Sequence, residues 1–266
     1  MITAAPIGAE LSRSEYPNLP LTPKEMAEEA HRCWCEGASV IHVHARTTDG
    51  RSTQDRRVYQ DIIGEIKARC DVIVQVSTGG DVRMTPEERI DAVHSSPDMA
   101  TLSLGTVNFG YDVFYNPLTT VERFAEVMRD QGVKPELEVF DTGMIETAKR
   151  LIQRSLLSRP LHWSLIMGVP GGIGGNISDL VHLVGSLPPG DTWQVGGIGR
   201  HQLPLTTAAM AMGGHVRVGA EDNIYFRHGK KITSSAQLVH RAAEISRLLE
   251  RPLAETAESR RILSLA

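Results

Sequence analysis

The chain has 266 residues, of which 41% are hydrophobic and 23% charged, which is ordinary globular composition. Its formal net charge is -4 and its basic residues are scattered, so the chain lacks the electrostatic footprint of a nucleic-acid-binding protein. No apolar run approaches the ~18 residues that a membrane helix requires, and the first residues lack the basic start of a secretion signal. Three cysteines, an odd number, favour reduced thiols that fill the core, so we expect a cytoplasmic protein.

Short apolar runs alternate with amphipathic stretches from one end of the chain to the other. The predicted strands are residues 2–6, 39–45, 72–77, 99–104, 136–140, 162–167, 193–196 and 215–218. The predicted helices are residues 23–36, 58–68, 86–94, 121–131, 142–153, 177–185, 205–212 and 234–249. About eight β-α units with a period of roughly thirty residues are typical of a TIM barrel, a parallel sheet closed on itself. A doubly wound sheet is the competing fold.

Helix starts support this division of the chain. Thr22 and Thr85 each offer an N-cap hydroxyl, followed by a proline at the first helical position and a glutamate at the third. Ser234 opens a similar capping box before the last long helix. Because no linker or low-complexity stretch interrupts the pattern, we expect residues 1–266 to form a single barrel domain with a C-terminal helical extension from about residue 250.

The second predicted strand ends in His42-Val43-His44. Residues i and i+2 of a strand point to one face, so both imidazoles would converge on one point from roots about 6–7 Å apart. Two neutral imidazoles aimed at one point suit a borderline-soft divalent ion such as zinc. The alternative is a pair of core histidines with ordinary hydrogen bonds.

The eighth predicted strand offers a third ligand, since catalytic zinc takes three protein ligands and leaves one position open. Glu221 follows that strand, and in a closed barrel the second and eighth strands lie near each other on either side of the first. Its neighbour Asp222 would point elsewhere and be free to act as a base, with Arg217 pairing with a carboxylate. Without the histidines, Glu221-Asp222 would be a charge pair at a helix start.

Small and polar residues follow every predicted strand, at the end that forms the active face of a parallel barrel. Among them are Glu10, Ser77, Gly79, Gly80 and Asn108. Later loops carry Gly172, Gly174, Gly199 and Arg200, where Asn176 would cap the next helix and Arg200 would add positive charge. These loops suit a phosphate-bearing cosubstrate, although their spacing is not a dinucleotide fingerprint.

The sequence resembles the beta-keto acid cleavage enzymes along its whole length. The matching segments are ITAAPIGAE at residues 2–10, IHVHAR at 41–46, VSTGG at 76–80, TLSLGTVNF at 101–109, GGIGR at 196–200 and GHVRVGAEDN at 214–223. The resemblance implies a TIM barrel, a zinc ion and a homotetramer. Within the family it is nearest to the enzymes that cleave 3-keto-5-aminohexanoate in lysine fermentation.

The resemblance also implies roles for individual residues. His42, His44 and Glu221 match the metal ligands, and Arg217 with Asp222 matches a catalytic pair. Ser77 and Thr101 match hydroxyls that contact or support the substrate, Glu138 matches a supporting carboxylate, and Glu10 matches the glutamate that receives the substrate's ammonium group. The glycine loops with Gly172, Gly174, Gly199 and Arg200 would face the CoA arm, with Gly79, Gly80 and Asn108 nearer the keto acid.

The reaction implied for the family converts a β-keto acid and acetyl-CoA into acetoacetate and a new acyl-CoA. Two other classes of protein remain open from the residues. A metal-dependent barrel hydrolase of the amidohydrolase type also uses His-x-His, but on the first strand and with further histidines on later ones. A metal-stabilised scaffold is the non-enzymatic alternative, which the costly clustering of polar groups at the strand ends disfavours.

Overall fold

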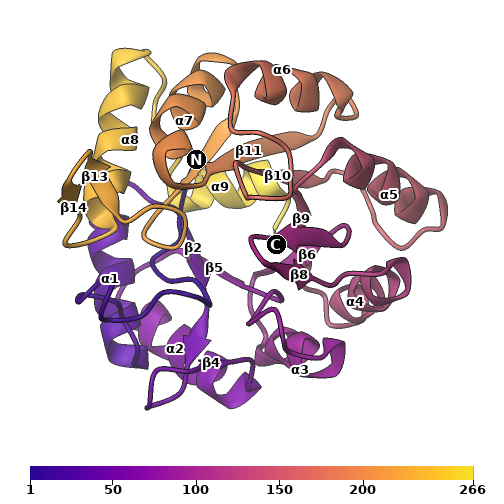
Figure 1. Ribbon diagram of the computed structural model, residues 1–266, viewed down its shortest axis with the longest axis horizontal. Helices are drawn as coiled ribbons and strands as arrows, with labels where there is room; N and C mark the ends of the chain where they lie inside the picture. The colour runs from indigo at the N-terminus through magenta and orange to yellow at the C-terminus, as the bar shows by residue number, and fades with distance from the viewer. Residues whose placement is uncertain (266) are drawn as a thin grey trace.

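Parallel strands pair edge to edge into a closed barrel in the computed structural model, which describes residues 1–265 (Figure 1). Around the barrel the strands run in the order β1 (Ile2–Ala4), β12 (His215–Val218), β11 (Thr192–Gly197), β10 (His162–Met167), β9 (Lys134–Val139), β6 (Met99–Ser103), β5 (Ile73–Val76) and β2 (Val40–Val43). Strand β2 pairs again with β1 and closes the circle. The predicted TIM barrel is therefore confirmed, and the doubly wound sheet is wrong.

Helices surround the barrel and connect successive strands (Figure 1). They are α1 (Pro23–Cys35), α2 (Arg56–Lys67), α3 (Pro86–Ile90) with η1 (Asp91–Ser95), α4 (Leu118–Asp130), α5 (Thr142–Gln153), α6 (Ile177–Ser186), η2 (Gly199–His201) with α7 (Gln202–Ala211), and α8 (Ala236–Leu248). Within residues 1–265, no helix is both long enough and apolar enough to cross a membrane.

The predicted capping boxes form at two of three sites. The Thr22 and Thr85 hydroxyls accept from the backbone N–H groups of Glu25 and Glu88. The two glutamate side chains in turn accept from the backbone N–H groups of the threonines. The box predicted at Ser234 is wrong, because α8 has Ser235 at its N-cap. The Ser234 hydroxyl accepts from the Ala236 N–H at 3.1 Å, and the Gln237 side chain accepts from the Thr233 N–H at 2.8 Å.

The cysteine prediction is also partly wrong. Cys33 and Cys70 are buried, as expected of residues that fill the core, but Cys35 is exposed. Cys35 lies two positions after the buried Cys33 on α1, and residues two apart on a helix point to opposite faces, so its side chain is turned to solvent.

Alternating side chains give the barrel an apolar outside and a polar inside. On β12, Val216 and Val218 join the hydrophobic core between strands and helices, whereas Arg217 points into the barrel with the same register as Thr3. The buried inward set comprises Thr3, His42, Gln75, Thr101, Ser103, Glu136, Glu138, Ser164, Gln194 and Arg217. TIM barrels are usually filled by Val, Ile and Leu, so this interior is built for polar chemistry.

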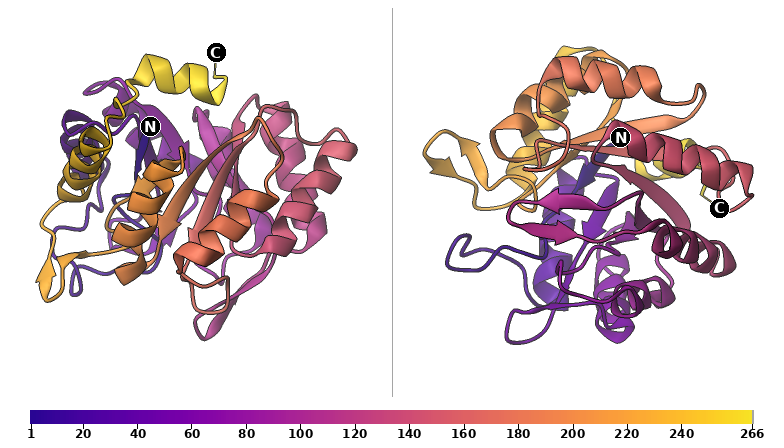
Figure 2. Two further views of the ribbon diagram at one scale, coloured as in Figure 1. Left: turned by 90° about the horizontal axis from the view of Figure 1, so that it is seen from above. Right: turned by 45° about the vertical axis from the view of Figure 1, so that its right-hand side comes forward.

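The amino-terminal end of the barrel is closed by a separate apolar plug. Val40, Ile73 and Met99, at the starts of three strands, pack against Leu263 of α9 (Thr256–Leu263). Figure 2 shows α9 lying across one end of the barrel, with the long strand-to-helix loops at the opposite end. A ligand would therefore enter from the carboxyl ends of the strands.

Three hairpins that the strand pattern did not predict extend the loops at that open end. They are β3 (Ala45–Arg46) with β4 (Ser52–Thr53), β7 (Val107–Phe109) with β8 (Asp112–Phe114), and β13 (Tyr225–Arg227) with β14 (Lys230–Lys231). Their strands are two or three residues long, too short to give a readable alternation in the sequence.

Candidate active site

A cavity of about 280 Å³ lies at the carboxyl ends of the barrel strands. Its polar lining comes from His44, Ser77, Glu138, Arg217, Glu221 and Asp222, and its apolar walls include Phe109, Phe114, Phe140, Val82, Ile166 and Ile198. This volume is at the small end of the range for ligand pockets. The cavity therefore suits a small organic acid and only the reactive end of a larger cosubstrate.

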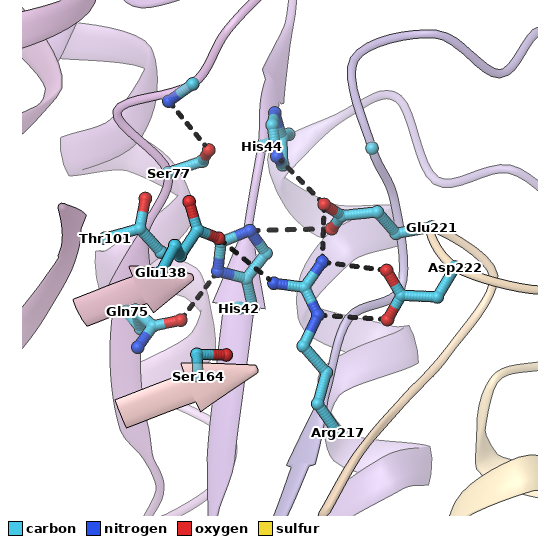
Figure 3. Close-up of polar contacts among 12 residues, drawn as sticks. His42, His44, Gln75, Ser77, Thr101, Glu138, Ser164, Arg217, Glu221 and Asp222 are labelled. Carbon is cyan, nitrogen blue, oxygen red and sulfur yellow. Dashed lines mark hydrogen bonds and ion pairs between the residues drawn. The ribbon is translucent and has the colours of Figure 1, made fainter. Parts of the chain in front are cut away.

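His42, His44 and Glu221 form the cluster that the sequence predicted. One potential ligand atom from each lies within 4.8 Å of the others, and within residues 1–265 no other group of three such side chains does so. Glu221 lies 3.5 Å from His42 Nε2 and 3.4 Å from His44 Nε2 (Figure 3). No third histidine joins the cluster in this part of the chain, unlike the pattern expected of an amidohydrolase-type site.

The protonation states of this cluster fit a divalent cation. His42 Nδ1 lies 2.7 Å from the Gln75 side-chain oxygen, which can only accept, so Nδ1 carries the proton and Nε2 presents a lone pair. Burial lowers the pKa of His42 to about 3, which keeps the ring neutral. His42 Nε2 and Glu221 Oε2 are buried and make no hydrogen bond among the described residues. A histidine nitrogen and a carboxylate oxygen that present lone pairs to the same point are ligands that zinc prefers.

Arg217 connects the cluster to a second carboxylate. Its Nε and Nη2 groups each donate to Asp222 at 3.0 Å, and Nη2 also lies 2.7 Å from Glu221 Oε1 (Figure 3). Burial raises the pKa of Glu221, but Arg217 and the two histidines outweigh it and hold that pKa well below its usual range. For Asp222 burial wins over the attraction of Arg217, and its pKa is raised. Two consecutive carboxylates therefore differ in proton affinity, as an anchor and a base would.

The other predicted polar residues occupy different places around this centre. Ser77 and Glu138 line the cavity. Glu138 accepts from Ser103 at 2.7 Å and lies 3.7 Å from Arg217 Nη1, and burial raises its pKa. Thr101 is fully buried and does not line the cavity, because its side-chain and backbone oxygens bind Thr78. Thr101 thus supports the loop that carries Ser77.

Glu10 lies on the rim of the cavity with Gly79 and Gly80. Its carboxylate makes no hydrogen bond or ion pair among residues 1–265, and the residue is exposed on the open side of the cavity. Burial and the nearby negative charge of Asp81 raise its pKa, while Arg46 opposes them. An unpaired carboxylate facing a cavity is a ready partner for a cation.

Besides Thr101, five predicted contact residues lie outside the cavity lining. Asn108 is exposed on β7, and its backbone packs against Gly171. Gly172, Gly174, Gly199 and Arg200 occupy the loops after β10 and β11, where the Gly199 N–H donates to the Asp222 carbonyl at 2.7 Å. The cap predicted for Asn176 is wrong, because its side chain turns to Asp179 at 3.2 Å instead of the helix N–H groups.

Sequence reasoning missed the aromatic wall. Phe109, Phe114 and Phe140 meet edge to face with ring centroids 6.2–6.4 Å apart. The first two come from the unpredicted hairpin β7–β8, so no strand pattern could place them beside the site.

Two buried arginines were missed as well. Arg46 donates to the carbonyls of Gly8, Leu11 and Gly50, and so holds the loop that carries Glu10. Arg89 donates to the carbonyls of Thr78 and Tyr115 and to the Asn116 side chain. Most of these partners are backbone carbonyls, which every residue carries, so the sequence pattern does not indicate these contacts.

Known proteins resemble this chain along its whole length. It is 43% identical to the 3-keto-5-aminohexanoate cleavage enzyme of Fusobacterium nucleatum, covering 100% of this chain and 97% of the relative. It is 34% identical to the 3,5-dioxohexanoate:acetyl-CoA acetone transferase of Paraburkholderia graminis, over 100% and 95% of the two chains. Among solved structures, apo ObcA shares the fold with a TM-score of 0.80 at 21% identity, over 94% of this chain and 66% of that one.

The family profile described as beta-keto acid cleavage enzyme matches residues 1–265. The 43% identity over 97% of a relative is likewise far above what a shared fold alone produces. The chain belongs to the beta-keto acid cleavage enzyme family.

Proposed function

We propose that this protein is a zinc-dependent enzyme that cleaves an aminated β-keto acid, such as 3-keto-5-aminohexanoate, with acetyl-CoA as cosubstrate. The products would be acetoacetate and the CoA thioester of the remaining fragment. The observation that carries the proposal is the pairing of Arg217 with Asp222 beside the His42, His44 and Glu221 cluster. Of these residues all but His42 line one small cavity. The name of the 43% identical relative supports the choice of keto acid, and that of the 34% identical relative supports acetyl-CoA.

His42, His44 and Glu221 would hold the zinc ion. When bound, the ion supplies an electrophilic centre that polarises the keto and carboxylate oxygens of the substrate. Asp222 is the base, because its raised pKa keeps its proton affinity closer to that of the substrate than an ordinary aspartate would. Arg217 holds the Asp222 carboxylate in one orientation through two hydrogen bonds.

The bonds made and broken balance without any further reagent. Asp222 takes a proton from the carbon between the keto and carboxylate groups, and that carbon attacks the acetyl carbonyl of acetyl-CoA. The CoA thiolate leaves and then adds to the original keto carbon. The bond between the original keto carbon and the carbon that attacked acetyl-CoA then breaks. The acetoacetate fragment recovers its proton from Asp222.

The walls of the cavity would protect this sequence from water. Phe109, Phe114 and Phe140 cover one side of the cavity with apolar surface, where a carbanionic intermediate would otherwise be protonated by solvent. The cavity is too small for the whole of CoA, so the arm would extend over the loops with Gly172, Gly174, Gly199 and Arg200. Glu138 and Ser77 would contact the reacting groups from the polar side.

Glu10 would select the substrate. Its unpaired carboxylate on the cavity rim suits the ammonium group of an aminated keto acid, and Arg46 holds its loop in place. Asn108 lies further out on β7, where it would order the rim of the pocket. The homotetramer and the role in lysine fermentation stay predictions that follow from the resemblance.

The test is an assay with 3-keto-5-aminohexanoate, acetyl-CoA and zinc, in which acetoacetate and the new acyl-CoA are both measured by mass spectrometry. We expect the two products in equal amounts, and a loss of at least about 100-fold in Asp222→Asn, which removes the base. Wild-type protein that forms neither product, or an Asp222→Asn variant with full turnover, would contradict the proposal. Hydrolysis of an amide or lactone without CoA would favour the hydrolase alternative instead.

A further inference from the structure

A line of buried amide and carboxylate side chains runs through the barrel interior from Thr3 to His42. Thr3 donates to the side-chain oxygen of Gln194 at 2.8 Å, and the Gln194 amide donates to Glu136 at 2.9 Å. Gln75 on β5 contributes to the pKa of Glu136, and its side-chain oxygen is 2.7 Å from His42 Nδ1 (Figure 3). All five side chains are at most 1% exposed, and the reaction described above uses only the last.

The donors in this line all point toward Glu136. Burial raises the pKa of Glu136 to about 7, and in its ionised form above that pH it offers only acceptors, so the neighbouring amides present their NH2 groups to it. The Gln75 amide nitrogen makes no hydrogen bond among residues 1–265. Against the effect of burial, the nearby Gln75 side chain lowers the pKa of Glu136. With its nitrogen turned toward Glu136, Gln75 turns its oxygen toward His42.

We propose that Gln75, oriented by Glu136, is a positioning residue that fixes the tautomer of His42 and so makes Nε2 a zinc ligand. The Gln75 oxygen can accept only from a protonated Nδ1, and this leaves the lone pair of Nε2 directed at Glu221. The arrangement is the familiar carboxylate–histidine–metal relation with one amide inserted between carboxylate and ring. The inference rests on the proposed role of His42 as a metal ligand.

The alternative orientation of Gln75 would disable the site. If the amide turned round, its NH2 group would face Nδ1, the ring proton would move to Nε2, and the atom facing Glu221 would be a donor. Nothing on β2 itself prevents this change, because His42 makes no other side-chain hydrogen bond among residues 1–265. The orientation is set from β9, through Gln75 on β5.

The test measures zinc affinity of the metal-free protein by competition with a chromophoric chelator, with no turnover involved. Gln75→Leu removes the acceptor and is expected to weaken zinc binding by about 10- to 100-fold. Gln75→Glu keeps an acceptor, and the double variant Gln75→Glu/Glu136→Gln keeps one carboxylate and one amide, so both should bind zinc within a few fold of wild type. Gln202→Leu removes another fully buried amide, on α7, and serves as the matched control.

Nitrogen NMR of the metal-free wild type reads the tautomer directly, and it requires no variant to fold. We expect His42 to carry its proton on Nδ1 in wild type and in Gln75→Glu. A proton on Nε2 in the wild type, or a Gln75→Leu variant that binds zinc as tightly as wild type, overturns the inference. Neither result depends on turnover, so the inference and the proposed reaction can fail separately.

Discussion

Arg217 donates to both carboxylate oxygens of Asp222, with two hydrogen bonds of 3.0 Å. The same guanidinium lies 2.7 Å from Glu221, so a single cation orients the metal-facing carboxylate and the base together. The fork geometry is specific to arginine, since the ammonium group of lysine has no rigid pair of donors.

Arg217→Lys should therefore keep the charge and lose the orientation of Asp222. We expect kcat to fall by at least about 100-fold while zinc content stays near one ion per chain. The measurement pairs steady-state kinetics with metal analysis of the same samples. Arg241→Lys is the control, a half-buried arginine of α8 that donates to the Phe226 carbonyl and lies over the Phe226 ring, with no carboxylate partner among residues 1–265. Equal losses in both variants would contradict a special role for Arg217.

Gly8 is the second site where a small change should act on the centre. A Cβ at this position would lie 2.7 Å from Glu221 Cγ, and Arg217 restrains Glu221 from moving away. We expect Gly8→Ala to weaken zinc binding by at least about tenfold with the barrel still folded, because a ligand displaced by a few tenths of an ångström loses its geometry. Gly64→Ala, where an added Cβ meets nothing within 4 Å, should bind zinc like wild type.

The cluster of His42, His44 and Glu221 was predictable because it depends on the alternation of side chains along a strand and on the closure of the barrel. His42-Val43-His44 lies on one strand, so its convergence follows from the alternation of side chains. Glu221 is far along the chain, yet the closed barrel places β12 beside β1 and brings it to the histidines. The fold rule thus supplied the one long-range contact that the metal cluster needed.

The rest of the site depends on contacts that leave no sequence pattern. Arg46 and Arg89 hold loops mainly through backbone carbonyls, which every residue carries. Phe114 reaches the cavity from a hairpin strand of three residues. Gln75 looks like any polar residue within a strand, and only its distance of 2.7 Å from His42 gives it a role.

Removal of the metal should be visible in stability. His42 and His44 are far from Glu221 along the chain and the closed barrel brings the three together, so zinc should bind the folded state alone. At zinc concentrations about 100 times the dissociation constant, the gain is about 2.7 kcal/mol. For a chain of this size that corresponds to a rise in Tm of roughly 5–10 °C. Calorimetry with and without a chelator measures it, and His44→Ala should abolish the shift; a shift that survives in the variant would place the zinc elsewhere.

Acid should destabilise the fold through His215. Burial lowers the pKa of His215 to about 3, helped by the Met1 ammonium group 3.2 Å from Nδ1. In the unfolded chain the pKa of histidine is about 6.5, so below that pH the unfolded state binds more protons than the folded one. The contribution is complete above pH 6.5 and is lost as pH falls toward 3.

Between pH 7 and pH 5 this group alone should lower the free energy of unfolding by about 2 kcal/mol. Urea denaturation at both pH values measures the change. His215→Gln should remove that part of the pH dependence, whereas His182→Gln, at an exposed position on α6, should not. If both variants keep the wild-type dependence, the acid sensitivity arises elsewhere.

Glu10 is expected to determine which keto acid is used. Its carboxylate has no partner among the described residues and faces the cavity, so an ammonium group of the substrate would gain a charge-assisted hydrogen bond there. Glu10→Gln keeps the shape and removes the charge. We expect KM for the aminated acid to rise by about tenfold or more with kcat little changed, because the lost contact is the same in the ground state and the transition state.

The comparison that decides the role of Glu10 uses a matched pair of substrates. An alkyl β-keto acid of the same length should be used equally well by wild type and Glu10→Gln, since it offers no charge to either. Asp81→Asn is the control variant, because Asp81 is already paired with Arg83 at 2.7 Å and should leave the preference in place. If Glu10→Gln retains the wild-type ratio of kcat/KM for the aminated over the alkyl acid, the amine is recognised by another group, and the unpaired carboxylate on the rim has no part in selection.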